Sequence, residues 1–136
     1  MKIEKKIKTI ASDVLLNEAS AIKNVSNYLD DDFEACVRAI FNTKGRVVLT
    51  GIGKSAIIAN KIVSTLNSTG TPALFMHAAD AIHGDLGMIQ KDDIVICLSK
   101  SGNTPEIKVL VPLIKRTGVP LVALVSNIES YLATQA

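Results

Sequence analysis

Four short apolar runs in the later part of the sequence limit the folds that are open to it. Three of them are nearly continuous in apolar content, as is typical of parallel strands that are covered on both faces. Patterns typical of helices separate them, so the alternation predicts βαβ units with right-handed crossovers. We therefore expect an α/β fold with an open parallel sheet. The runs are VVLT (47–50), ALFM (73–76), IVICLS (94–99) and LVALVS (121–126).

The helices of this fold can also be placed from the sequence. One is expected over about 55–69 with Gly70 as its cap, and another over about 105–117 with Gly118 as its cap. Thr104 then takes the N-cap position, and Pro105 the first helical position, which proline tolerates. A shorter helical piece is expected over 78–84.

The residues before the first strand read as helices. An apolar stripe at helical period over 3–29 predicts one long helix, with a break near Ala21 as an alternative. The acidic residues 30–32 then cap a second helix, which we expect to end at Lys44 and Gly45. Its predicted inner face carries Phe33, Val37, Ile40 and Phe41.

These elements predict a single domain over 1–136, with N-terminal helices in 1–45 and the sheet core in 46–136. The fourth apolar run lies close to Ala136, which leaves the last strand of the predicted sheet uncovered at its edge. Either another chain covers that edge, or the sequence is a fragment, and we expect the last part of the domain to be missing.

Composition excludes several classes of function. The net charge is only +2, and no basic stripe is interleaved with aromatic residues, which argues against a nucleic-acid partner. No apolar run approaches the ~20 residues of a membrane span, and the start of the chain alternates charge and isoleucine too finely for a signal peptide. We therefore expect a soluble, cytoplasmic protein without a membrane partner. The lysines near the start read as a solvated helix face rather than a functional patch.

The two cysteines, Cys36 and Cys97, are both expected to be small buried hydrophobes. Two isolated thiols do not make a disulfide framework, and no cluster of cysteine and histidine indicates a metal site. No metal and no cofactor is expected.

The loop over 99–104 is the strongest candidate for a binding site. Ser99, Ser101 and Thr104 each carry a hydroxyl that can donate a hydrogen bond, and Gly102 lets the backbone approach an anion. The following helix adds the positive end of its dipole, so the loop favours a phosphate group. The alternative is that these side chains merely cap the helix, which needs only one of them.

The loop over 51–55, GIGKS, lies at the same edge of the predicted sheet. A Walker A loop needs glycine where Val48 stands, and a dinucleotide site needs an acidic residue where His77 follows the second strand, so both readings are disfavoured. A third reading remains. Gly51 and Gly53 allow a tight turn, Lys54 places a positive charge over the site, and Ser55 caps the next helix while facing the ligand. As an alternative, Lys54 points to solvent.

The third loop at this edge, over 77–85, holds both histidines, His77 and His83. Either could move a proton near neutral pH, or could be structural. Asp85 could orient His83, or cap a turn at Gly84. Glu106 lies in the first turn of a helix, where the dipole favours a carboxylate in any case, and only its position behind the serine-rich loop makes it a candidate.

Taken together, these segments resemble the sugar isomerase (SIS) domain, and more narrowly the arabinose 5-phosphate isomerases. GIGKS, STGTPALFMH, HGDLGMI and LSKSGNTPEI occur in the order and spacing of that subfamily, over about residues 15–130. HGDLGM and STGTP are quite specific to the subfamily, whereas SxSGxT marks SIS domains in general.

The resemblance implies interconversion of D-arabinose 5-phosphate and D-ribulose 5-phosphate, on the route to 3-deoxy-octulosonate and lipopolysaccharide. It also implies a three-layer α/β/α sandwich with a Rossmann-like parallel sheet, and a homotetramer with active sites between subunits. Ser99, Ser101 and Thr104 would hold the phosphate with Ser55 nearby, and the matched active-site positions are Lys54, His83 and Glu106. In two places the chain departs from the family, which usually has asparagine at Lys100 and glutamate at Asn103. The family's later glutamate, second active-site histidine and last strand would lie beyond Ala136, as would paired CBS domains.

A second function of a different class is binding without catalysis. Domains that resemble this one also act as sugar-phosphate sensors in regulators. No helix-turn-helix is evident in the first 45 residues, and a pure sensor has no chemical need for the histidine of HGDLGM.

Overall fold

The computed structural model describes residues 2–136, with side-chain burial from residue 6 onward. It divides between Val37 and Arg38 into two compact units, each of which is described by itself. The first unit holds α1 (Lys2–Val25), the 3-10 turn η1 (Ser26–Tyr28) and the start of α2 (Asp31–Asn42). The predicted long helix is confirmed as far as Val25, and the alternative of a break near Ala21 is wrong because α1 is continuous there.

The acidic start of α2 behaves as predicted, but its apolar face does not. The amide of Phe33 donates a hydrogen bond of 3.0 Å to Asp30 Oδ1, which is an N-terminal cap. Phe33, Val37 and Phe41 are exposed, so the prediction of a buried inner face is wrong for them, and only Ile40 is half-buried. An amphipathic pattern indicates which face of a helix is apolar, but it does not indicate whether another element covers that face. Helix α2 ends at Asn42 with most of its apolar face exposed.

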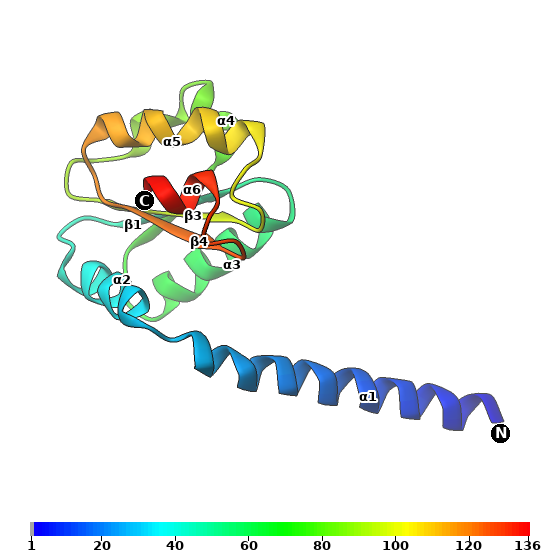
Figure 1. Ribbon diagram of the computed structural model, residues 1–136. Helices are drawn as coiled ribbons and strands as arrows, with labels where there is room; N and C mark the ends of the chain where they lie inside the picture. The colour runs from blue at the N-terminus through cyan, green and yellow to red at the C-terminus, as the bar shows by residue number, and fades with distance from the viewer. Residues whose placement is uncertain (1) are drawn as a thin grey trace. The chain divides into compact units, whose positions relative to one another are not determined.

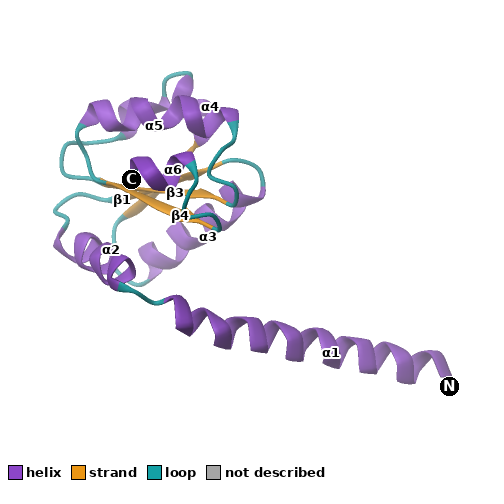
Figure 2. Cartoon of the chain, in the orientation of Figure 1, coloured by secondary structure: helices purple, strands orange, loops and turns teal. Residues whose placement is uncertain are grey.

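Four parallel strands form the sheet of the second unit, in the order β2-β1-β3-β4. Figures 1 and 2 show the sheet with α5 on one side and α3 on the other. The central strands β1 and β3 are buried along their whole length, whereas the edge strands β2 and β4 are only partly buried. This confirms the predicted α/β class with a parallel sheet. The strands are β1 (Val47–Gly51), β2 (Ala73–His77), β3 (Ile94–Ser99) and β4 (Leu121–Val125).

Helices cover both faces of this sheet and complete the predicted three layers (Figure 1). Alternate residues of β1 point to opposite faces, so Val48 packs under α4 and α5 while Val47 and Leu49 pack under α3. The helices are α3 (Lys54–Ser68), α4 (Ala78–Ile82), the 3-10 turn η2 (Asp85–Met88), α5 (Pro105–Thr117) and α6 (Tyr131–Gln135). The short α6 packs against β4 and α5.

The helix ends agree closely with the sequence pattern. α5 has the predicted bounds and ends at Gly118, whose φ of 77° lies in the left-handed region that favours glycine. Thr104 occupies the predicted N-cap position, but its side chain makes no capping hydrogen bond. The Thr104 hydroxyl is therefore not used to cap α5.

The two cysteines differ in their environment. Cys97 is fully buried on β3, as predicted, and burial raises the pKa of its thiol to about 12. Cys36 is only partly buried, which still raises its pKa, so its predicted full burial is wrong. In the described part of the chain, no three side chains of histidine, cysteine, aspartate or glutamate are grouped to hold a metal ion. Among the described helices, none is both long and apolar enough to cross a membrane.

Candidate active site

The three candidate loops meet at one edge of the sheet. Gly51 at the end of β1 pairs with His77 on one side and with Leu98 on the other, and Ser99 pairs with Val125. Because all four strands are parallel, the loops that follow them leave from the same edge, where ligands of open α/β sheets bind. The expected meeting place of the loops over 51–55, 77–85 and 99–104 is confirmed.

A cavity of about 340 Å³ opens at this edge, between α3 and the ends of β3 and β4. This open hollow has a mostly apolar surface, and its polar lining residues are two lysines and three serines, with no carboxylate among them. Lysines and serines beside such a hollow suit an anion, because no negative charge among the lining residues opposes it. The lining residues are Lys54, Ser55, Ile58, Leu98, Ser99, Lys100, Leu124, Val125 and Ser126.

The start of α3 forms one wall of this cavity. Gly53, with φ of 57°, occupies the N-cap position, so the prediction that Ser55 caps the helix is wrong. No side chain caps α3, and its first turn brings Lys54 and Ser55 to the cavity together with the positive end of the helix dipole. A Cβ at Gly51 would lie 3.1 Å from the Leu98 carbonyl oxygen, a tight contact that favours glycine in the β1–α3 turn.

The loop over 99–104 forms the opposite wall through its first residues. Ser99 is 5% exposed, lines the cavity, and accepts a hydrogen bond of 3.1 Å from the Gly102 amide. Its hydroxyl proton remains available for a ligand. Ser101, which is exposed, accepts from the Asn103 amide at 3.3 Å. Neither Ser101 nor Gly102 lines the cavity, although both stand within three residues of Ser99.

The hydroxyl of Thr104 is buried and has no hydrogen-bond partner in the described part of the chain. The same holds for Thr50, which lies on β1 one residue before Gly51 and is fully buried. Buried hydroxyl groups are rarely left unpaired, because the lost hydrogen bond costs about 1–3 kcal/mol. Thr104 does not line the cavity, so the structure does not bring together all three hydroxyls predicted to bind phosphate.

The segment that follows β4 supports the loop over 99–104 in a way that the sequence did not indicate. The Leu132 amide donates to the Gly102 carbonyl at 3.0 Å, and the Tyr131 amide donates to Asn103 Oδ1 at 2.9 Å. Gly102 has φ of 66°, and a Cβ there would collide with the Ser130 side chain. Lys100, named above as a departure from the family, also lines the cavity, as does Ser126, for which the sequence carries no local signal.

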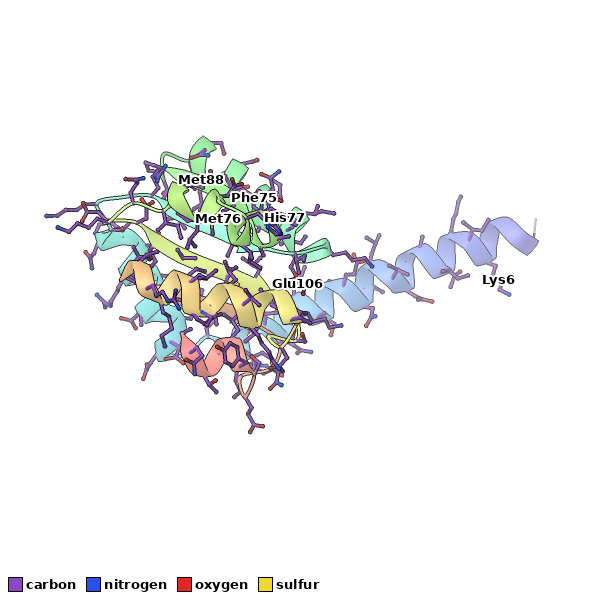
Figure 3. The ribbon with its side chains drawn as sticks, turned by 90° about the horizontal axis from the view of Figure 1, so that it is seen from above. Lys6, Phe75, Met76, His77, Met88 and Glu106 are labelled. Carbon is purple, nitrogen blue, oxygen red and sulfur yellow. The ribbon has the colours of Figure 1, made fainter. Side chains whose placement is uncertain are left out.

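The histidines and Glu106 lie apart from the cavity. His77 ends β2, and its Nδ1 accepts a hydrogen bond of 3.3 Å from the Ala79 amide, so it caps α4. His83 follows α4 and is exposed, and Asp85 begins η2. Figure 3 shows Glu106 in the first turn of α5 and His77 at the end of β2. None of these four side chains lines the cavity.

The two groups of candidates also belong to different faces of the sheet. The cavity is walled by α3, whereas α4, which His83 follows, packs with α5 on the other face. In the described part of the chain, the lysines and serines that line the cavity therefore lie on a different face of the sheet from His83 and Glu106.

Comparison with known proteins shows which family has this architecture. Residues 40–136 match the SIS domain family. The arabinose 5-phosphate isomerase KdsD of Pseudomonas aeruginosa is 49% identical over 119 residues, which are 88% of this chain and 36% of that protein. A probable arabinose 5-phosphate isomerase of Haemophilus influenzae is 44% identical over 127 residues, 93% of this chain and 38% of that protein. The chain thus spans little more than a third of the length of these relatives.

A solved structure gives the same result. The E. coli CFT073 protein c3406, in complex with arabinose 5-phosphate, superposes with a TM-score of 0.91 at 37% identity, over 97% of this chain and 70% of that one. The parallel sheet, the cavity beside α3 and the match over residues 40–136 agree with one another. This chain belongs to the SIS domain family.

Proposed function

We propose that this chain is the SIS domain of an isomerase that interconverts D-arabinose 5-phosphate and D-ribulose 5-phosphate. The observation that carries the proposal is the cavity at the carboxyl edge of the sheet, where Lys54, Ser55, Ser99 and Lys100 face one space without a carboxylate. A sugar phosphate presents a dianion to such a site. The identity of 49% to an arabinose 5-phosphate isomerase supports this choice of substrate.

The proposed domain is 1–136, with helices in 1–45 and the sheet core in 46–136. It acts in the cytoplasm on a route to lipopolysaccharide, where phosphorylated pentoses are made and consumed.

The proposed binding mode places the phosphate between the first turn of α3 and Ser99, with Ser101, Gly102 and Thr104 closing around it. In this binding mode, the Thr104 hydroxyl, which has no hydrogen-bond partner in the described part of the chain, donates to the anion.

The proposed reaction proceeds through a cis-enediol. A base removes the C2 proton of the open-chain aldose, the C1–C2 double bond forms, and the carbonyl oxygen at C1 takes up a proton to give the enediol. The C2 hydroxyl then loses its proton as the C2 carbonyl forms, and the base returns a proton to C1, which yields the ketose. Glu106 is a candidate base, and His83 opens the ring or protonates an oxygen. Lys54 stabilises the developing oxyanion through its charge.

The separation of these groups in one chain supports an assembly with shared sites. Lys54 lines the cavity, whereas His83 lies outside it on the segment after α4. In the proposed homotetramer, a neighbouring subunit supplies His83 to the cavity of the first. The site is then complete only in the oligomer.

Conversion of D-ribulose 5-phosphate to D-arabinose 5-phosphate tests the proposal directly. The protein that carries this chain is incubated with the ketose, and the aldose is measured by chromatography. Ser99→Ala should raise KM, whereas Ser64→Ala, an exposed serine in the middle of α3, should leave turnover and KM unchanged. Binding of the sugar phosphate without any conversion would instead favour a sensor of sugar phosphates.

A further inference from the structure

Hydrogen bonds tie the loop over 99–104 to the segment that follows β4. One of them depends on a side chain, because the Tyr131 amide donates to Asn103 Oδ1 at 2.9 Å. Two others join backbone groups, which most substitutions leave in place. The identity of residue 103 therefore decides whether the side-chain tie exists. The backbone bonds run from the Ser126 amide to the Lys100 carbonyl at 3.1 Å and from the Leu132 amide to the Gly102 carbonyl at 3.0 Å.

The Asn103 side chain uses both ends of its amide group. Because the Tyr131 amide can only donate, the side-chain oxygen of Asn103 faces it, and the amino group is left to donate elsewhere. It donates to the Ser101 carbonyl at 3.2 Å. An ionised carboxylate at this position accepts from Tyr131 but has no hydrogen to donate. The side chain of Asn103 is exposed, so its contribution comes from these two contacts and not from filling the core.

The contact with the Ser101 carbonyl reaches the cavity through one peptide group. The Ser101 carbonyl and the Gly102 amide belong to the same planar unit, so fixing the direction of one fixes the other. The Gly102 amide donates to Ser99 Oγ at 3.1 Å. Ser99 is 5% exposed and lines the cavity. With its oxygen engaged by this amide, the Ser99 hydroxyl keeps its hydrogen for a ligand.

The peptide between Ser101 and Gly102 needs such support because of the glycine. Gly102 has φ of 66°, and glycine adopts either sign of φ at little cost, so this peptide can rotate. Rotation would turn the Gly102 amide away from Ser99 and leave the serine hydroxyl without a fixed direction. Asn103 opposes the rotation by holding the Ser101 carbonyl, and the Tyr131 amide in turn holds Asn103.

We propose that Asn103 is a positioning residue of the anion site, which fixes the peptide between Ser101 and Gly102 and thereby orients the Ser99 hydroxyl toward a bound phosphate. The inference rests on the proposed binding of phosphate at this cavity, and it adds a residue that does not line the cavity. Without Asn103, the loop is ordered only when the anion binds, and this ordering weakens the affinity.

Calorimetric titration with inorganic phosphate tests the proposal on two asparagine variants of the parent protein. Asn103→Ala removes the tie. Asn127→Ala is the matched control, because Asn127 is also exposed and its Oδ1 accepts from the Glu129 amide at 3.0 Å within its own segment. We expect the phosphate Kd to rise about threefold to tenfold in Asn103→Ala, as for one weakened hydrogen bond, and to stay at the parent value in Asn127→Ala. An unchanged Kd in Asn103→Ala, even with lower stability, would overturn the proposal.

A double-mutant cycle with Ser99→Ala shows whether Asn103 acts through Ser99. In the Ser99→Ala background the hydroxyl that Asn103 orients is absent, so we expect Asn103→Ala to raise the Kd further by less than about twofold. The same factor in both backgrounds would mean two independent effects and would refute the positioning role. A parent protein that binds no phosphate would overturn the anion site itself, and this inference with it.

Discussion

At the scale of single residues, the two glycines Gly102 and Gly118 share a positive φ but differ in their surroundings. Gly102 has φ of 66° and Gly118 has φ of 77°. A Cβ at Gly102 meets Ser130, whereas a Cβ at Gly118 meets nothing within 4 Å. We expect Gly118→Ala to lower the free energy of unfolding by about 1 kcal/mol and Gly102→Ala by roughly 2–4 kcal/mol. Urea denaturation measures the loss in both variants. Equal losses would contradict the prediction, because they would show that the loop over 99–104 moves away from Ser130 at no cost in free energy.

A substitution at Thr50, unlike those at the two glycines, is expected not to destabilise the protein. Its hydroxyl is fully buried without a partner in the described part of the chain, so the folded state leaves a polar group unsatisfied. Thr50→Val keeps the branched shape and removes that group. We expect the free energy of unfolding to rise by about 1 kcal/mol or to stay unchanged. A loss of more than about 1 kcal/mol in the urea midpoint analysis would mean that an ordered water satisfies the hydroxyl.

Lys100 can be tested as a binding residue against a lysine of similar exposure. It lines the cavity, whereas Lys108 lies on α5 outside it. Lys100→Gln should weaken binding of inorganic phosphate about twofold to fivefold at low salt, as expected for an exposed charge. Lys108→Gln should have no effect. Calorimetry at two salt concentrations measures the phosphate affinity of both variants. An unchanged affinity in Lys100→Gln would show that Lys100 does not belong to the site.

At the scale of elements, an ion pair joins the start of β1 to the start of β3. Arg46 donates to Asp93 at 2.8 Å and to the Met88 carbonyl at 2.7 Å. Burial alone would raise the pKa of Asp93, but hydrogen bonds from the Arg46 side chain and from the Gln90 and Arg46 amides lower it overall. Asp93 is 2% exposed, so its charge depends on these donors.

Because the pKa of Asp93 is lowered in the folded protein, its ionisation makes the free energy of unfolding depend on pH in a known direction. The stabilisation is fully present above the unfolded pKa of about 4 and is lost as pH falls through the lower, folded value. Unfolding experiments between pH 7 and pH 2 should therefore show stability falling below about pH 4. Asp93→Asn removes this titration and should flatten that part of the curve relative to the parent. An unchanged slope in Asp93→Asn would assign the effect to other carboxylates.

The elements also show what the sequence pattern can and cannot predict. The sequence predicts strands β1 and β3 correctly because buried parallel strands need continuous apolar runs, and it predicts the ends of α5 because Pro105 and Gly118 act locally. It predicts burial wrongly for Phe33 and Phe41, because the apolar face of a helix does not indicate what covers it. The bond from the Leu132 amide to the Gly102 carbonyl links residues 30 apart, since 132 − 102 = 30, and no local signal announces it.

At the scale of the whole molecule, the separation of Lys54 from His83 leads to the decisive prediction. If a site takes Lys54 from one subunit and His83 from another, Lys54→Met and His83→Ala each remove activity from every site while leaving the fold intact. When equal amounts of the two variants are unfolded together and refolded, about a quarter of the sites receive both intact residues. Isomerase activity should therefore recover to about a quarter of the parent's. Variants refolded separately and then assayed together without subunit exchange are the control. No recovery in the mixed assembly would place both residues in the site of a single chain.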